Sequence, residues 1–172
     1  TVNPNELPYS RQDEYYFRTG YAAFQNGNTD EAYDYFRQCT GDPAYAPHAT
    51  YYKSYIDYSR GDLNAAKEGF KSIADVPAYE PIIPFYLLQI EFRQGNYDYV
   101  IEHGVPLMAK ATGTREIEIA RILSESYFRK QMYAEALDQI ENYERLGGEM
   151  GVEELYLAGY SNYNRLYYTN AS

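Results

Sequence analysis

The sequence predicts an all-α fold built from successive pairs of helices. Self-similar segments begin at Gly27, Gly61, Gly95 and Gln131, which lie 34, 34 and 36 residues apart. A period of this size is typical of helical repeat proteins. Ahead of each segment, apolar residues recur at helical spacing. No stretch shows a sustained alternation of apolar and polar residues between hairpin turns, so we expect no strand.

Each repeat begins with a helix whose apolar residues lie mostly three or four positions apart. This spacing places them on one face of the helix, from which they can pack against a neighbour. In the four repeats these residues are Tyr16, Phe17, Gly20 and Phe24; Tyr51, Tyr55 and Tyr58; Phe85, Leu88 and Phe92; and Leu123, Tyr127 and Phe128. The chain holds 23 tyrosines, and each combines a large apolar ring with a hydroxyl that can face water. We therefore expect a core built largely of tyrosine.

A short turn leads from the first helix of each repeat to the second. Glycine readily adopts the positive φ that ends a helix, and Gly27, Gly61 and Gly95 occupy this place. The residue after each glycine can cap the second helix with its side chain. These residues are Asn28, Asp62 and Asn96. The second helices are expected to end before helix-breaking segments. Those segments are Gly41-Asp42-Pro43, Val76-Pro77, Thr112-Gly113 and Gly147-Gly148.

The period and the order of small and large residues resemble those of the tetratricopeptide repeat (TPR) family. That family repeats a helix-turn-helix unit of about 34 residues, with small residues where the helices touch. The small first-helix residues here are Gly20, Ser54, Ser124 and Gly159, the small second-helix residues are Ala32, Ala66 and Ala136, and the large residues that follow are Phe36, Phe70 and Ile140. The resemblance covers residues 13–168. It implies a right-handed α-α superhelix of about four helix pairs and a terminal helix.

The resemblance also implies how the chain is organised. It predicts a single TPR domain over residues 1–172, with repeats at 13–46, 47–80, 81–116 and 117–150 and a partial repeat or capping helix at 151–168. The third repeat departs from the pattern, because Leu88 and Val100 occupy its two small positions while Gly104 replaces a large residue. This exchange roughly conserves volume, so we expect the two helices still to pair.

In TPR proteins the first helices line a concave groove, and the resemblance therefore implies a set of candidate binding residues. They are Phe17, Tyr21 and Phe24; Tyr51, Tyr55 and Tyr58; Phe85, Gln89 and Phe92; Arg121, Glu125 and Phe128; and Tyr156, Tyr160 and Tyr163. Two interpretations remain open. The rings can fill the space between helices, or they can form a Tyr-rich surface that binds a peptide, since Tyr offers a large and rigid contact area.

One known binding mode of the family is not expected. Some TPR proteins grip a peptide C-terminus with Lys and Asn side chains in the groove. The corresponding positions here hold Phe17, Tyr21, Tyr51 and Tyr55. The sequence therefore does not indicate recognition of a C-terminal carboxylate.

The terminal helix carries two apolar stripes. Tyr156, Tyr160, Tyr163 and Tyr167 form one stripe, and Leu155, Gly159, Asn162 and Leu166 form the other. We expect the second stripe to pack on the fourth repeat. The tyrosine stripe would then be covered by a continuing repeat, by a peptide partner or by another copy of the chain, because an uncapped repeat leaves its packing surface in water.

Several classes of function are disfavoured by the composition. The net charge of −10 and a pI near 4.6 disfavour binding to nucleic acids or anionic membranes, and no apolar run approaches the roughly 18 residues that span a bilayer. The single cysteine, Cys39, excludes an internal disulfide and a multi-cysteine zinc site. Neither His48 nor His103 belongs to a metal-binding motif, and no Gly-rich phosphate loop is present. We expect no metal, no other cofactor and no catalytic site.

The sequence thus predicts a non-enzymatic module or scaffold that binds a peptide or protein segment in a Tyr-rich groove. The alternative is a structural or regulatory segment of a larger protein that self-associates, as a homodimer, through its terminal helix. Because the chain starts at Thr1 rather than Met, we expect it to be a fragment of a longer sequence. Its composition fits a bacterial cell envelope, including the periplasm, and a cytoplasm equally well.

Overall fold

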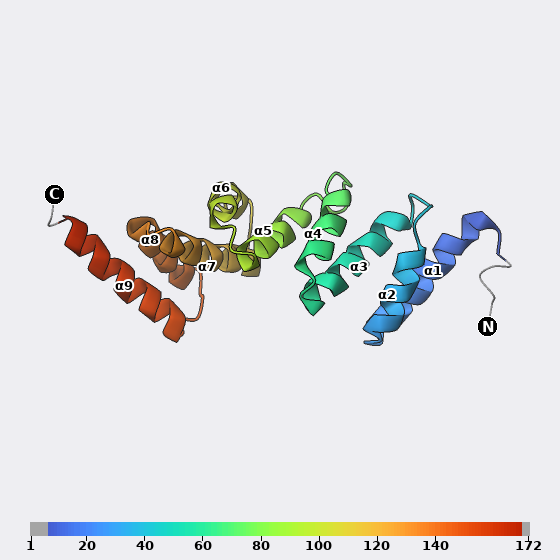
Figure 1. Cartoon of the computed structure of the whole chain (residues 1–172), viewed down its shortest axis with the longest axis horizontal. Helices are drawn as coiled ribbons and strands as arrows, with labels where there is room; N and C mark the ends of the chain where they lie inside the picture. Colours follow the sequence, from blue (N-terminus) through green and yellow to red (C-terminus); the bar gives the residue numbers. More distant parts are fainter. Residues whose placement is uncertain (1–6, 170–172) are drawn as a thin grey trace. The chain divides into compact units, whose positions relative to one another are not determined.

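The described part of the chain is entirely helical. The computed structural model describes residues 7–169, with only the backbone described for residues 9, 10 and 167–169, and these residues form nine helices and no strand (Figure 1). The helices are α1 (Tyr9–Gln25), α2 (Thr29–Gln38), α3 (Ala46–Arg60), α4 (Leu63–Ser72), α5 (Ile83–Arg93), α6 (Tyr97–Met108), α7 (Thr114–Arg129), α8 (Tyr133–Arg145) and α9 (Val152–Thr169). The predicted all-α class is confirmed.

The helices gather in two compact units, which meet in sequence between Leu87 and Leu88, inside α5. In the first unit, α1 packs along α2, α2 packs on α3, and α3 packs along α4, while α1 and α3 also touch. In the second unit, α6 packs on α7, α7 packs along α8, and α8 packs on α9, while α7 and α9 also touch. Within each unit, a second helix therefore packs on the first helix that follows it: α2 on α3, α6 on α7 and α8 on α9. The single TPR domain over residues 1–172 remains a prediction.

The turns between paired helices have the predicted backbone conformation. Gly27, Gly61 and Gly95 all have positive φ, and at Gly61 the value is 84°. In the fourth repeat Gln131 takes the same place with a φ of 62°, although it is not a glycine. The hydrogen bond from the Met132 amide to the Tyr127 carbonyl, 2.9 Å long, closes this turn. The left-handed turn is thus maintained even where its usual residue is missing.

The predicted capping by side chains is confirmed at only one of three turns. The Asp62 carboxylate accepts a hydrogen bond from the Ala65 amide at 3.2 Å. Asn28 makes no side-chain cap bond. Asn96 also makes none, because its side-chain amide donates instead to the buried Glu91 carboxylate at 2.5 Å. The competing acceptor explains why Asn96 is not available as a cap.

Small residues allow the paired helices to approach closely. Ala32, Ala66 and Ala136 are completely buried. At Gly20, a Cβ atom would lie only 3.0 Å from the Phe36 ring, so the aromatic side chain of α2 fills the space that glycine leaves on α1. Such complementary packing of small and large side chains gives an interior close to crystal density.

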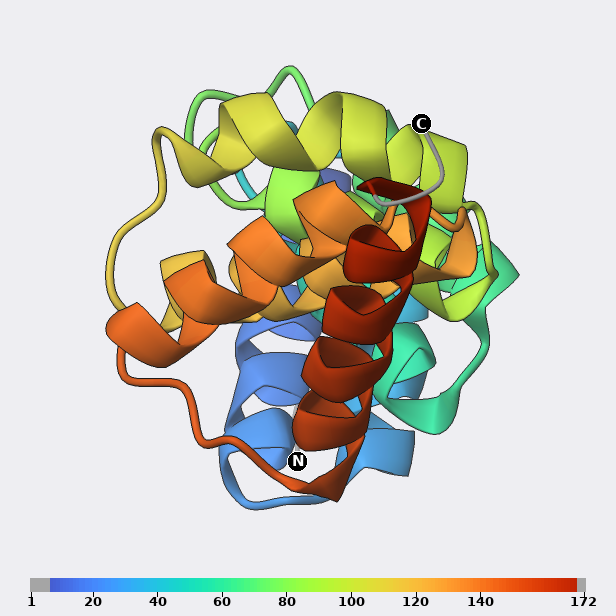
Figure 2. The ribbon, with the colours of Figure 1, turned by 90° about the vertical axis from the view of Figure 1, so that its left-hand side faces the viewer.

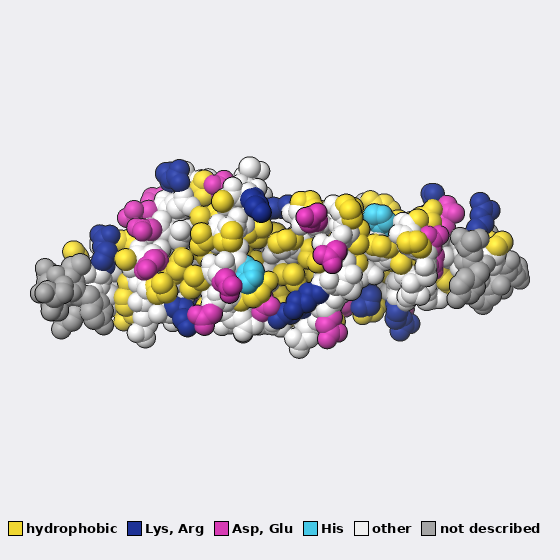
Figure 3. All heavy atoms as spheres, turned by 90° about the horizontal axis from the view of Figure 1, so that it is seen from above, with side chains coloured by type: hydrophobic (Ala, Val, Ile, Leu, Met, Phe, Trp, Pro, Cys, Tyr) yellow, Lys and Arg dark blue, Asp and Glu magenta, His cyan; other side chains and the backbone are white. Residues whose placement is uncertain are grey.

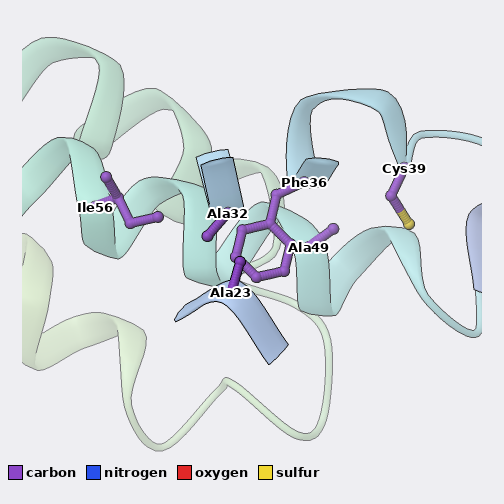
Figure 4. Packing of buried hydrophobic residues seen from close by; sticks show 6 residues of the cluster. All are labelled: Ala23, Ala32, Phe36, Cys39, Ala49 and Ile56. Atoms are coloured by element: carbon purple, nitrogen blue, oxygen red, sulfur yellow. The ribbon is translucent and has the colours of Figure 1, made fainter. Parts of the chain in front are cut away.

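One of these contacts lies in the core of the first unit. Ala23 of α1, Ala32 and Phe36 of α2, and residues of α3 form a buried hydrophobic cluster (Figure 4). In Figure 4 the Phe36 ring lies among the alanines, whereas Cys39 lies at the other end of the cluster, just after α2. The Cys39 thiol is buried and lies 3.5 Å from the Asp13 carbonyl oxygen. Cys39 is therefore a core residue.

The third repeat shows the exchange of volumes that the sequence predicts. Leu88 and Val100 are completely buried. Gly104 lies where a Cβ atom would be 2.9 Å from Leu123 and 3.5 Å from Leu88, so these larger side chains occupy the missing volume. α6 packs on α7, whereas the predicted pairing of the two helices of this repeat, α5 and α6, stays a prediction.

Replacing Ala32 with leucine should destabilise the fold, because the larger side chain cannot enter the closed contact around Phe36. We expect a loss of about 1–3 kcal/mol of unfolding free energy, which overpacking a core typically costs, and a melting temperature lower by several degrees. The matched control is Glu68→Leu on the exposed side of α4, which should change stability by less than about 0.5 kcal/mol. Equal shifts of the two variants in thermal unfolding would contradict the assigned contact.

The Cys39 thiol should react very slowly in the native protein. Burial, followed by the nearby Asp13 and Asp42 carboxylates, raises the pKa of Cys39 to about 12, and only the thiolate reacts readily. We expect labelling by a thiol reagent at pH 8 to be at least about 100-fold slower in the native than in the unfolded protein.

The same pKa shift affects stability at alkaline pH. The unfolded thiol ionises near its ordinary pKa of 9.0, while the folded thiol stays protonated up to about 12. Its contribution to stability is therefore complete below about pH 9 and is lost as pH rises toward 12.

The control for the labelling experiment is Glu68→Cys, whose exposed thiol should label rapidly. Equally fast labelling of Cys39 would show that the site is open.

Candidate binding site

In the first unit the predicted groove residues form an aromatic network. The Phe17 ring lies 5.8 Å from His48, 5.9 Å from Tyr45 and 6.3 Å from Tyr52, measured between ring centroids. Phe24 packs against Tyr52 at 5.2 Å. Phe17 and Phe24 are half-buried, so they fill the space between α1 and α3.

The tyrosines of α3 extend this network. Tyr51 stacks on the buried Tyr79 with a centroid separation of 4.7 Å and an angle of 13°. The Tyr79 hydroxyl lies 2.5 Å from the His48 Nδ1 atom. Burial raises the pKa of Tyr79, so its hydroxyl stays protonated even at alkaline pH, where an exposed tyrosine ionises. Tyr55 and Tyr58 each present an edge to Tyr86.

Two of the residues that hold this network together are absent from the predicted set. Tyr52 touches Phe24 and stacks on Phe36 at 5.5 Å, and Tyr86 stacks on Phe70 at 4.7 Å. The helical period gives the positions of these two residues in their helices. It does not indicate that a ring at such a position contacts three helices. Among the predicted aromatic residues of α1 and α3, Tyr21 is the most accessible, at 37%. Most of the predicted residues of this unit thus contribute to packing.

The predicted residues of α5 are also half-buried. The Phe85 ring lies 6.2 Å from Tyr86, and the Phe92 ring lies 6.2 Å from Tyr97. Gln89 lies on the same helix and is half-buried. None of these three side chains is exposed enough to be a main contact for a partner.

In the second unit, four predicted residues come together in an open cavity of about 640 Å³ between α7 and α9. Arg121, Glu125 and Phe128 line it from α7, and Tyr156 lines it from α9. The spacing of the α7 residues, four and then three positions, places them on one face of the helix. We call this cavity the α7–α9 pocket. Its lining is completed by Ser124, Arg129, Ile140, Val152, Glu153, Glu154 and Leu157. Its volume is typical of sites that hold a side chain or a small ligand.

Both cations of the α7–α9 pocket are paired along α7. The Arg121 guanidinium donates to both Glu118 oxygens, at 3.0 and 2.8 Å, and lies 5.7 Å from the Phe92 ring centroid. These hydrogen bonds are the main reason that the pKa of Arg121 is raised. Arg129 donates to Glu125 at 3.0 Å. The cations are therefore already compensated by acidic neighbours.

The other wall of the pocket is acidic and begins α9. Glu153 is exposed, and the Glu154 carboxylate accepts a hydrogen bond from the Gly151 amide at 3.1 Å. Three carboxylates, counting Glu125, thus face two arginines in the pocket lining. Because both arginines are compensated, the pocket favours a positively charged group over a negatively charged one.

Aromatic rings form the apolar part of the site. The Phe128 ring meets Tyr160 edge-on at 5.4 Å and Tyr156 at 6.3 Å. Tyr156 is 62% exposed and Tyr160 is 42% exposed. Tyr163 is 68% exposed, and neither Tyr160 nor Tyr163 lines the pocket. On the face of the molecule seen in Figure 3, hydrophobic side chains, tyrosine included, likewise reach the surface between acidic and basic groups.

The packing face of α9 differs from the prediction. Leu157 and Ser161 are buried, whereas Leu155 and Leu166 are 59% and 53% exposed and Gly159 has no heavy atom within 4 Å of an added Cβ. The expected packing of the Leu155 stripe on the fourth repeat is therefore wrong. The reason is that α9 is rotated about its own axis relative to the prediction, so it packs on α8 with the face opposite Gly159. The Tyr167 side chain lies outside the described residues.

The prediction from sequence also omitted the pocket residues that surround the predicted ones. Val152, Glu153 and Leu157 come within one turn of Tyr156, so they share its neighbourhood on α9. They could have been found only by knowing how α9 is rotated, which the helical period does not specify.

A second cavity, of about 460 Å³, lies beside the start of α6. Lys130 closes it by an ion pair with Asp98, with an N–O distance of 2.8 Å. The buried Glu91 carboxylate is held by Asn96. Since its polar groups are bonded to one another, this cavity offers fewer contacts to a partner than the α7–α9 pocket.

The described residues contain no cluster of three or more His, Cys, Asp or Glu side chains placed to hold a metal ion. Among the same residues, no helix combines the length and the apolar character that crossing a membrane requires.

Comparison with known proteins supports the architecture. The sequence matches no protein-family model, and no curated protein matches it. A solved structure described as a MamA RS-1 ArsTM double mutant superposes with a TM-score of 0.72 over 89% of this chain and 84% of that chain, at 11% sequence identity. At this identity the likeness concerns the fold alone. MamA contains tetratricopeptide repeats, and the chain therefore has a TPR-like helical repeat fold.

Proposed function

We propose that this chain is a non-enzymatic protein-interaction module of the TPR family, acting as a single domain. It binds a segment of a partner protein through first-helix residues. The α7–α9 pocket is the main contact. Protein binding is the function that a TPR-like fold suggests, and Tyr-rich surfaces are common at protein interfaces.

The observation that carries this proposal is the composition of the α7–α9 pocket. It combines accessible rings, Tyr156 above all, with the aliphatic side chains of Val152 and Leu157 and with charged groups at its edge. Interfaces with this arrangement, an apolar centre and a polar rim, obtain most of their binding energy from a few aromatic anchors. Tyr156 and Phe128 are the anchors that we assign.

The charged groups of the α7–α9 pocket indicate which residues the partner segment carries. The chain carries a net charge of −10, and the pocket presents Glu153 and Glu154 beside arginines that are already paired with Glu118 and Glu125. A segment with an apolar residue next to a Lys or Arg would complement this lining. Its association should be faster at low ionic strength, because opposite charges steer the encounter.

The proposal is tested by selecting displayed random peptides against the full 172-residue chain and measuring the affinity of those enriched. We expect Tyr156→Ala and Phe128→Ala to weaken binding at least tenfold, or about 1.4 kcal/mol. Glu153→Lys should weaken basic peptides and reduce the dependence of their binding on salt.

The matched control is Tyr35→Ala, which removes a tyrosine from α2 of the first unit. It should leave peptide binding unchanged while circular dichroism shows the same helix content for every variant. If no peptide is enriched, or if Tyr156→Ala binds as well as wild type, the pocket is not the binding site.

A further inference from the structure

Two exposed tyrosines of α9 lie side by side at the α7–α9 pocket. In Figure 2, α9 (dark red) lies toward the viewer, beside α8 (orange). Tyr156 and Tyr160 are about one helical turn apart, and both side chains are exposed. Their ring centroids are 5.9 Å apart, with an angle of 35° between the ring planes. We call these two side chains the tyrosine pair.

Two further rings hold the tyrosine pair in place. The Phe128 ring of α7 lies 5.4 Å from Tyr160 at an angle of 72° and 6.3 Å from Tyr156 at an angle of 68°. The Tyr133 ring of α8 lies 5.7 Å from Tyr160. Edge-to-face contacts of this kind are favourable beyond the area that they bury. A ring that is already held in place loses little entropy when a partner binds.

The hydroxyl groups of the tyrosine pair are open to a partner. Among the described residues, neither hydroxyl takes part in a hydrogen bond. The Ser124 hydroxyl of the pocket, by contrast, donates to the Arg121 carbonyl at 2.7 Å, and both arginines of the pocket are paired with glutamates. Inside a helix, the backbone amides and carbonyls bond to one another. The site therefore offers a partner's backbone hydroxyl donors but few acceptors.

A proline-rich segment fits this combination of groups. Proline has no N–H group, so its backbone needs no acceptor, while its carbonyl oxygens still accept hydrogen bonds. Such segments adopt the polyproline II helix, which has no internal hydrogen bonds and advances about 6 Å over two residues. This advance matches the 5.9 Å between the rings of the tyrosine pair. Aromatic-lined grooves bind these segments at low entropic cost, because the helix is formed in advance.

The charge of the site favours a basic residue next to the prolines. Glu153 precedes Tyr156 by three positions, so both lie on one face of α9. Glu153 is exposed, and its carboxylate forms no ion pair with any described residue. An arginine can stack on a tyrosine ring while its planar guanidinium donates to a carboxylate, which the compact ammonium of lysine does less well.

We propose that the α7–α9 pocket and the tyrosine pair together bind a proline-rich segment that carries an arginine. This inference rests on the proposed function and names the chemistry of the segment that is bound. The prolines lie on the tyrosine pair and follow the axis of α9, and their carbonyls accept hydrogen bonds from the two hydroxyls. The arginine contacts Glu153. A partner helix fits less well, because its carbonyls are already bonded within the helix.

The probe is a labelled peptide of one arginine followed by nine prolines. Fluorescence anisotropy with the full 172-residue chain should show saturable binding. A peptide with the same arginine and alternating glycine and serine should bind about tenfold more weakly, because this flexible chain must be ordered on binding. Tyr156→Phe and Tyr160→Phe each keep a ring and remove a hydroxyl, so each should weaken binding of the proline peptide about fivefold.

A double exchange tests the arginine. Replacing the arginine of the peptide with glutamine should weaken binding to wild type about threefold, the effect typical of an exposed ion pair. The same replacement should have almost no effect on binding to Glu153→Gln, because the ion pair is already lost in that variant. Equal losses with both proteins would overturn the proposed contact between the arginine and Glu153.

The matched control is Tyr35→Phe on α2, which should bind the proline peptide like wild type, while circular dichroism shows the same helix content for every variant. The proposal is overturned if the proline peptide does not bind, if the flexible peptide binds as tightly, or if Tyr156→Phe and Tyr160→Phe both bind like wild type. It is also overturned if wild type forms a dimer that Tyr160→Ala dissociates, because the occupant is then a second copy.

The outcome also separates this inference from the proposed function. If displayed peptides without proline bind through Tyr156 and the proline peptide does not bind, only this inference fails. If neither kind of peptide binds, the proposed function fails with it.

Discussion

The close approach of two helices at a small residue is the contact on which this structure depends. Ala32, Ala66 and Ala136 are completely buried, and each allows a neighbouring helix to come near enough for a large side chain to pack beside it. In helical repeat arrays, stability is approximately the sum of contributions from the repeats and from the contacts between neighbouring repeats. Where the small and large residues change places, as at Leu88 and Gly104, the volume is kept and so is the packing.

Tyrosine supplies much of the apolar surface that aliphatic residues supply in other helical proteins. Rings such as Tyr51 and Tyr79 stack within the first unit, and the Tyr79 hydroxyl is satisfied by His48. A ring used in this way is not free to bind a partner. In the second unit, Tyr156 and Tyr160 keep more than a third of their surface exposed. The same residue type is thus buried at some places and accessible at others, since Tyr127 and Tyr143 of the second unit are buried as well.

α9 links stability to binding, because it covers one surface and exposes another. Leu157 and Ser161 close the end of the α7–α8 pair. The residues on the opposite side face away from α8, so this contact leaves them exposed. The terminal repeat of an array must have a polar outer face or be covered, and the outer face of α9 contains Leu155 and Leu166.

The sequence by itself determined the helix pairs of this protein. Local chemistry explains why: a left-handed turn at Gly61 needs no tertiary contact to be favoured, and the spacing of Ala32 and Phe36 specifies a helix face. Only the tertiary structure decided which of these faces are buried. The rotation of α9, which buries Leu157 instead of Leu155, follows from its packing on α8, and the helical period alone does not specify it. The α7–α9 pocket exists because of that rotation, so no pattern within one helix could predict it.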